Sequence, residues 1–254
     1  MKKRNPFLII LINLLFVSSI VFAADVRVIP YPDGVDIKSE GASAAPKEIN
    51  HKSSPYFNMP DVFELISNDH LTILSHYPTY QQTTEYSCGP ATVLTTLWYY
   101  GKKDFTEKDL IEKMNATFKH GTNLQSIADF LRAIGWKVKT SLDTKESFDT
   151  YEKFALFVQQ ELKASHPVMV ENVAWGGHWR AIIGYDTMGT QTTADDVLIF
   201  ADTYDTADHN QDGYSIENGE NFFWTWFDHN ILPENERNQP FIVAYPTKQM
   251  NHKT

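Results

Sequence analysis

Residues 81–91 read Gln81-Gln82-Thr83-Thr84-Glu85-Tyr86-Ser87-Cys88-Gly89-Pro90-Ala91, and Cys88 is the only cysteine of the chain. Apolar residues at helical spacing follow this stretch and predict a buried helix that begins near Cys88. The start of a helix has unpaired backbone N–H groups and the positive end of the helix dipole, and both lower the pKa of a thiol. The stretch therefore favours a reactive nucleophile, whereas the alternative is a small buried core residue.

Helical patterns continue through the first half of the region 61–254. Capping residues mark the starts of two further helices, namely Thr106 with Asp109 three residues on, and Thr122 with Gln125. Gly135 is predicted to end the second of these helices, and a longer amphipathic helix is expected over 147–164. Short strands are expected over 71–74 and 136–142.

Beyond Pro167 the hydrophobic pattern changes to period two and to continuous apolar runs, which are typical of strands. We expect strands over 168–175, 179–185, 197–201 and 241–245. Consecutive strands with short links favour an antiparallel sheet. The sequence therefore predicts an α+β fold, in which a helical half packs on an antiparallel sheet.

A candidate base for the thiol lies at the start of one of these strands. His178 follows Gly176 and Gly177, and two glycines leave the backbone open to close approach by a ligand. Histidine is the usual acid–base residue near neutral pH, and the apolar strand behind it would hold it on a rigid sheet. The alternative is a hydrogen-bonded structural histidine, but the presence of Cys88 favours the catalytic interpretation.

An acid that orients the base is expected at the end of the next strand. Asp202 ends that strand, so pairing of the two strands would bring its carboxylate beside His178 and hold the imidazole tautomer. Asp205 is the reserve candidate because it lies three residues further on. For either aspartate the alternative is an ordinary residue of a turn.

The loop before Cys88 contains candidates for stabilising an oxyanion. Gln82 precedes Cys88 by six residues, and its side-chain amide can donate one hydrogen bond while the Cys88 backbone N–H donates another. Gln81 competes with Gln82 by proximity. A polar loop residue is the alternative for both.

Three motifs together form one pattern: Gln82-x5-Cys88-Gly89-Pro90-Ala91, Gly177-His178-Trp179 with Gly184-Tyr185-Asp186 behind it, and the strand that ends in Asp202. This pattern resembles the peptidase C39-like group of papain-like cysteine proteases, over about residues 75–245. The resemblance implies a papain-like fold. It also implies that Cys88 is the nucleophile, His178 the base, Asp202 the orienting acid and Gln82 the oxyanion donor.

Several features separate the chain from the better-known members of that group. Those members often have Asp-Pro at the third site, whereas Thr203 follows Asp202 here, which keeps Asp205 open as the orienting acid. They are fused to an ATP-driven transporter and cleave double-glycine leaders, and we do not expect that substrate for this chain. A more distant likeness to phytochelatin synthases lies in the Gln-x5-Cys-Gly and Gly-His motifs, and it implies a γ-glutamyl-cysteine substrate as a variant.

Residues 1–23 have the pattern of a secretory signal peptide. Basic residues precede an apolar run that ends at Phe22, and cleavage is expected after Ala23. Because the run is shorter than the roughly 20 residues that cross a bilayer, we expect an exported protein, periplasmic or extracellular, without stable membrane insertion after cleavage. Residues 24–60 are rich in Pro, Ser, Ala, Gly and charge, and they predict a linker or flexible arm before one domain over 61–254.

The formal net charge of −10 argues against nucleic acid as a partner, and no cofactor is expected. Residues 208–213 match the opening of a calcium loop, but Gly219 stands where a bidentate Glu is required, so a polar turn is favoured and no metal is assigned. A metal hydrolase built on His178 and nearby acids would leave Cys88 unexplained. The aromatic cluster over 222–227 favours core packing over a substrate groove.

These observations predict an exported cysteine peptidase or amidase that acts on a peptide or amide substrate. Two alternatives stay open: a catalytically silent binding module with the same fold, and a γ-glutamyl-cysteine hydrolase or transpeptidase. The oligomeric state is left open as well.

Overall fold

The computed structural model describes residues 40–44, 60–144, 147–172, 177–206, 211–228 and 232–247. Within these residues, a seven-stranded sheet has the strand order β2-β7-β3-β4-β5-β6, and β1 pairs with β4 outside this path. Every strand pair is antiparallel. The strands are β1 Leu71–Ile73, β2 Trp136–Thr140, β3 Val168–Asn172, β4 His178–Asp186, β5 Val197–Asp202, β6 Tyr214–Asn218 and β7 Phe241–Pro246.

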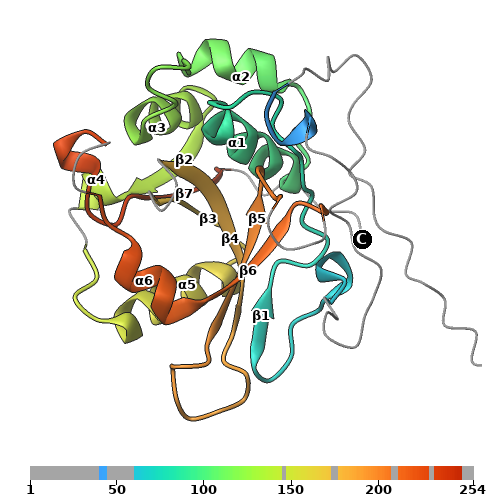
Figure 1. Ribbon diagram of the computed structural model, residues 1–254, viewed down its shortest axis with the longest axis vertical. Coiled ribbons are helices and arrows are strands. Elements are labelled where there is room, and N and C mark those ends of the chain that lie inside the picture. Colours follow the sequence, from blue (N-terminus) through green and yellow to red (C-terminus); the bar gives the residue numbers. More distant parts are fainter. Residues whose placement is uncertain are drawn as a thin grey trace, which may run out of the picture.

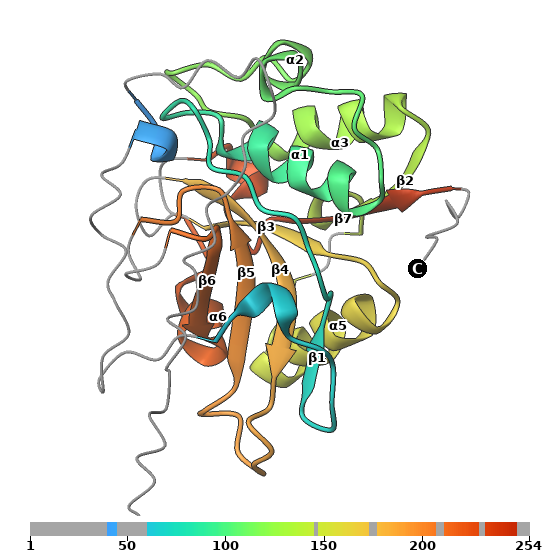
Figure 2. The ribbon, with the colours of Figure 1, turned by 90° about the vertical axis from the view of Figure 1, so that its right-hand side faces the viewer.

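Helices α1, α2 and α3 gather above the sheet, and α5 and α6 lie at its lower part (Figures 1 and 2). α1 packs on β4, while α5 packs on β3 and β4. The helices are α1 Cys88–Tyr99, α2 Glu107–Lys113, α3 Leu124–Ala133, α4 Ser141–Thr144, α5 Tyr151–Lys163 and α6 Gly219–Thr225, with short 3-10 turns at Ala42–Ala44, Val62–Glu64 and Glu234–Glu236. The predicted α+β fold is confirmed.

Trp179, the second residue of β4, is hydrogen-bonded to the helical half of the fold. Its side chain is fully buried, and its indole N–H donates to the Thr122 carbonyl, at 2.9 Å, just before α3. The Thr92 hydroxyl of α1 donates to the Trp179 carbonyl, also at 2.9 Å. Because the backbone and the side chain of Trp179 are both held, the preceding residue, His178, starts from a fixed position.

Capping chemistry explains where α2 and α3 begin. Thr106 and Asp109 form the predicted capping box of α2. α3 starts one residue later than predicted, because Asn123 is its N-cap and accepts the Ser126 N–H, while the Thr122 carbonyl holds Trp179. Gly135 follows α3 at a φ of +84°, as expected for a residue that ends a helix.

The structure corrects the end of one predicted strand and adds elements that the sequence did not predict. The strand expected over 136–142 ends at Thr140, because the Thr140 hydroxyl accepts the Asp143 N–H and starts the short helix α4. β6 and α6 were not expected at all. Among the described strands β6 pairs with β5 alone, and Tyr214 is its one buried residue, so its sequence carries a weak apolar signal.

The aromatic cluster over 222–227 is mainly core, as predicted. Phe222, Phe223 and Trp226 are buried, whereas Trp224 and Phe227 are exposed. The Trp226 indole N–H donates to the Glu171 carbonyl of β3 at 2.9 Å. α6 therefore uses one aromatic face to cover the sheet.

Candidate active site

Cys88 is the first residue of α1, and 7% of its surface is exposed. The Ser87 carbonyl accepts the Ala91 N–H at 2.8 Å, which begins the helical hydrogen bonding. Pro90 lies in the first turn, where its missing N–H removes no helical hydrogen bond. The N–H groups at the start of α1 have no helical partners, so they are available near the sulfur.

A buried carboxylate, Glu107, holds the loop that leads to Cys88. The Thr83 N–H and hydroxyl donate to it at 3.0 and 2.6 Å, and the hydroxyls of Ser87 and Tyr80 donate at 2.6 and 2.9 Å. Glu107 is the first residue of α2, and 4% of its surface is exposed. This role was not predicted from the sequence, since an acid in the first turn of a helix is ordinary and only the fold brings Glu107 to the loop.

His178, the first residue of β4, bonds the Cys88 thiol through its ring. The backbone N–H groups of Trp179 and Gly89 also bond the sulfur. The predicted meeting of the thiol and the imidazole is therefore seen in the structure. It depends on α1 packing against β4, because the two residues are far apart in the chain.

Asp202, the last residue of β5, lies on the other side of the His178 ring. Its Oδ1 atom is 2.7 Å from His178 Nε2 and accepts the Tyr204 N–H at 2.9 Å. Its Oδ2 atom accepts the Ser215 hydroxyl at 3.1 Å and lies 3.8 Å from Arg180 Nη1. Since Nε2 faces Asp202, Nδ1 is the ring nitrogen left to bond the thiol.

The three groups shift one another's pKa values. Burial raises the pKa of Cys88, but the hydrogen bond and charge of His178 outweigh it, and the thiol pKa lies below its ordinary value. Burial lowers the pKa of His178, but Asp202 and then Cys88 raise it to about 9. Burial raises the pKa of Asp202, but His178 and Arg180 hold it well below its usual range. These shifts favour a thiolate at Cys88, an imidazolium at His178 and an ionised carboxylate at Asp202.

Gln82 is joined by hydrogen bonds to Thr203, the residue after Asp202. Its amide oxygen accepts the Thr203 hydroxyl at 3.0 Å, and its backbone N–H donates to the Thr203 carbonyl at 2.9 Å. One amide hydrogen goes to the Thr84 carbonyl at 2.8 Å. The same nitrogen carries a second hydrogen, for which no acceptor is seen among the described residues. The competitor Gln81 donates to the Asp205 carbonyl at 3.3 Å.

Asp205, the reserve acid, serves the loop between β5 and β6. Its Oδ2 atom accepts the Gly213 N–H at 2.9 Å. The geometry at His178 thus favours Asp202 over Asp205. Residues 208–210 of the calcium-like stretch 208–213 lie outside the described residues, and within the described ones no cluster of His, Cys, Asp or Glu could hold a metal ion.

A short segment of the predicted arm contacts the loop before Cys88. The Ser43 N–H donates to the Gln82 carbonyl at 3.1 Å, and the Gly41 N–H donates to Glu85 at 2.9 Å. Glu85 also accepts the Tyr204 hydroxyl at 2.9 Å, and the Tyr204 ring stands edge-on to that of His178. Glu85 therefore links residues 40–44 to Tyr204, which lies beside His178.

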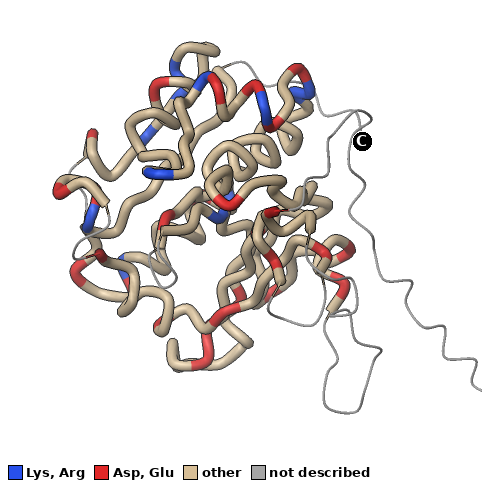
Figure 3. Tube along the Cα trace, turned by 45° about the horizontal axis from the view of Figure 1, so that its top comes forward, with Lys and Arg blue, Asp and Glu red and all other residues tan. Residues whose placement is uncertain are grey.

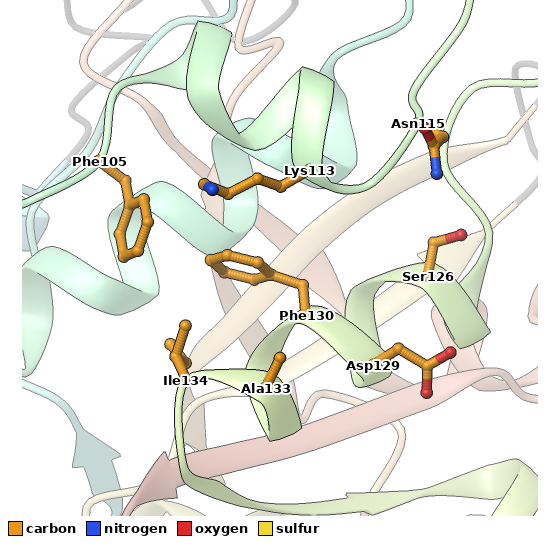
Figure 4. A pocket seen from close by; sticks show the side chains of 8 residues that line it. All are labelled: Phe105, Lys113, Asn115, Ser126, Asp129, Phe130, Ala133 and Ile134. Atoms are coloured by element: carbon orange, nitrogen blue, oxygen red, sulfur yellow. The ribbon is translucent and has the colours of Figure 1, made fainter.

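A separate hollow of about 430 Å³ lies between α2 and α3 (Figure 4). Phe105, Lys113, Phe130 and Ile134 contribute to its walls. Its lining shares no residue with the group around Cys88. Separately, in the part of the chain that the structure describes, no helix has the length and apolar character to span a membrane.

A family model for the Peptidase_C39 like family matches residues 74–229, which is more than half of the chain. The chain belongs to this family. The match includes Gln82, Cys88, His178 and Asp202, and it confirms the resemblance on which the sequence analysis relied.

Solved structures similar to this family member include two transporter peptidase domains. A double glycine motif protease from an AMS/PCAT transporter, in complex with its leader peptide, is 16% identical, with a TM-score of 0.43 and coverage of 67% of this chain and 91% of that one. The peptidase domain of Streptococcus ComA, a bi-functional ABC transporter of a quorum sensing pathway, is 17% identical, with a TM-score of 0.41 and coverage of 67% and 99%. No curated protein matches the chain. The likeness to phytochelatin synthases stays a prediction.

Proposed function

We propose that this member of the Peptidase_C39 like family is an exported cysteine hydrolase that cleaves a peptide or amide bond. The observation that carries the proposal is the unbroken contact from the Cys88 thiol through the His178 ring to Asp202. Such a chain of nucleophile, base and orienting acid activates a thiol for attack on a carbonyl. The proposed export rests on the signal pattern of residues 1–23.

In the first half of the reaction, the Cys88 thiolate attacks the carbonyl carbon of the substrate. A carbon–sulfur bond forms, and the π electrons of the carbonyl move to its oxygen. The second amide hydrogen of Gln82 and the Cys88 backbone N–H would stabilise this oxyanion. The intermediate then collapses, the carbon–nitrogen bond breaks, and the amine leaves with the proton of the His178 imidazolium.

In the second half, His178 is neutral and accepts a proton from water. The hydroxide attacks the thioester carbon, and collapse of the second intermediate expels the Cys88 thiolate with a carboxylic acid product. The imidazolium is restored. Asp202 holds the ring orientation and stabilises its charge in both halves.

The proposal is tested by incubating the purified protein with a diverse peptide pool and identifying products by mass spectrometry. We expect products from the wild type and none from Cys88→Ala, whose circular dichroism and thermal midpoint should match those of the wild type. Asp205→Asn is a matched acid control that leaves the contact with His178 in place. Cleavage by the Cys88→Ala protein would rule out the thiol mechanism.

Alkylation separates a hydrolase from a silent binding module. Iodoacetamide should modify Cys88 in the folded protein near neutral pH faster than an ordinary thiol with a pKa of about 8.5. A thiol that reacts only after unfolding, in a protein that cleaves nothing, would favour the binding module. N-terminal sequencing of protein from the culture medium or periplasm tests export, and we expect Ala24 as the first residue.

A further inference from the structure

Glu171 of β3 lies close enough to the proposed nucleophile for the charge of Cys88 to raise its pKa, and it takes no part in the triad. In the ladder between β3 and β4, Glu171 stands opposite Trp179, and Asn172 stands opposite His178. Residues opposite each other in an antiparallel pair share one face of the sheet. The Trp179 indole reaches the Thr122 carbonyl, so this is the face covered by α1 and α3.

The carboxyl group of Glu171 is buried without a full set of partners. The residue is 6% exposed, and its Oε2 atom has no hydrogen-bond partner in the described part of the chain. Its backbone, by contrast, is satisfied, since its N–H donates to Pro240 and its carbonyl accepts from Trp226. A buried polar atom without a partner is costly, so a native protein that retains one needs a reason.

A second unpartnered polar atom lies on the same side. Thr122 is 4% exposed, and its Oγ1 atom has no partner among the residues described. This hydroxyl lies 3.3 Å from the position that a Cβ atom on Gly89 would occupy, beside Cys88. Glu171 and Thr122 both adjoin Trp179, one across the ladder and one through the indole.

The charges around Glu171 are mostly negative. Burial first, and then the charges of Cys88, Glu236 and Asp228, raise its pKa well above the ordinary value, while His178 alone acts in the opposite direction. Glu236 is already occupied by the Leu124 N–H, and Asp228 by the Leu232 N–H. Burial and the neighbouring negative charges therefore disfavour the Glu171 carboxylate, and a cation beside it would offset both effects.

The net charge of the whole chain also favours a cationic ligand. The formal net charge is −10, and Figure 3 shows acidic positions over the whole trace, while the basic ones gather mainly in its upper part. An excess of one charge attracts ligands of the other sign to the surface.

We propose that Glu171 and the Thr122 hydroxyl form a subsite that binds an ammonium group of the substrate, either a lysine-type side chain or a free amine, next to the bond that Cys88 attacks. The subsite rests on the proposed hydrolase function. An ammonium group has three donors and no acceptor, which suits two acceptors without partners. On binding, Glu171 releases its proton to solvent and forms a charge-assisted hydrogen bond with the ammonium.

The test uses Cys88, the sole thiol of the chain, as the reporter. Its labelling rate is measured with 2-aminoethyl methanethiosulfonate, which carries an ammonium, and with neutral methyl methanethiosulfonate, each divided by the rate of a small free thiol. We expect the wild type to favour the cationic reagent about tenfold, as one charge-assisted hydrogen bond would give. Glu171→Gln should lose this preference, and Thr122→Val should reduce it.

Glu152→Gln is the matched control, because it makes the same side-chain substitution at an exposed position on α5. It should keep the preference. Fast labelling of Cys88 with no preference for the cation, or a preference that survives in Glu171→Gln, would overturn the subsite and leave the hydrolase proposal intact. Failure of every reagent to label folded protein would instead contradict the reactive thiolate.

Peptide cleavage gives a second readout. Substrates that differ only by lysine or norleucine beside the cleaved bond are compared by kcat/KM. Glu171→Gln should lower the value for the lysine peptide about tenfold and leave the norleucine peptide unchanged. Equal effects on both peptides would contradict a cation subsite.

Discussion

At the scale of single residues, the candidate site is a set of groups whose charges depend on one another. His178 bonds both Cys88 and Asp202, so removing any one of them changes the pKa of the other two. Glu171 stands outside this set but within reach of its charges. Two consequences can be measured.

The first consequence is a pH window for catalysis. The pKa of Cys88 is lowered, so the thiolate forms below the ordinary range; the pKa of His178 is about 9, so its proton is lost above that pH. Peptide cleavage should therefore hold a plateau up to about pH 9 and then fall. Alkylation of Cys88 should not fall there, because it needs no acid.

Asp202→Asn tests whether Asp202 sets the pH above which cleavage falls, which is the upper limb of the pH profile. Without the carboxylate, the His178 pKa should drop, and the upper limb of the cleavage profile should move to lower pH. Ser215→Ala, which removes only one hydrogen bond to Asp202, should move it much less. Identical profiles for all three proteins would contradict the assignment of Asp202.

The second consequence concerns stability. The pKa of Glu171 is raised in the folded protein, so its contribution to stability is fully present below the unfolded value of about 4.3 and is lost as pH rises toward the folded value. Glu171→Gln should therefore raise the thermal midpoint more at pH 7 than at pH 4. Glu112→Gln, at an exposed position on α2, serves as control. An equal shift of the thermal midpoint at both pH values in Glu171→Gln would contradict the raised pKa of Glu171.

At the scale of secondary-structure elements, α1, β4 and β5 each contribute one end to the site. Cys88 begins α1, His178 begins β4 and Asp202 ends β5. Element ends are suited to this role because their side chains reach a common edge while the elements behind them are packed. α2 contributes Glu107, whose carboxylate accepts hydrogen bonds from the loop before Cys88.

Glu107→Gln should loosen the loop before Cys88. The amide would present hydrogens to the Thr83 and Ser87 donors, so at least one buried donor loses its acceptor. We expect a loss of about 1–3 kcal/mol in the free energy of unfolding, measured by denaturant titration. Glu112→Gln on the same helix should stay within about 0.5 kcal/mol, and similar values for both variants would contradict the role of Glu107.

At the scale of the whole molecule, segment 40–44 contacts the loop before Cys88, although the two are far apart in the chain. Gly41 has a φ of +72°, and a Cβ atom there would lie 2.7 Å from the Gln82 carbonyl oxygen. Only glycine suits this backbone and this approach.

Gly41→Ala should therefore displace segment 40–44 from the loop. We expect faster hydrogen exchange in both stretches, and a lower kcat if the contact holds Gln82 in place. Ser43→Ala is the control, because the contact of Ser43 with Gln82 uses its backbone N–H. Exchange that is unchanged in Gly41→Ala would contradict this connection.

The sequence by itself determined the α+β class, the start of α1 at Cys88 and the strand that begins at His178, because helical spacing, capping and strand patterns are local properties. It also named the two aspartates, Asp202 and Asp205. Only the tertiary structure shows that Asp202 lies against the His178 ring: the register of β4 with β5 places Arg180 opposite Asp202, which sets Asp202 beside His178. The same reason applies to Glu107 and Glu171, because their contacts join residues that only the packing of helices on the sheet brings together.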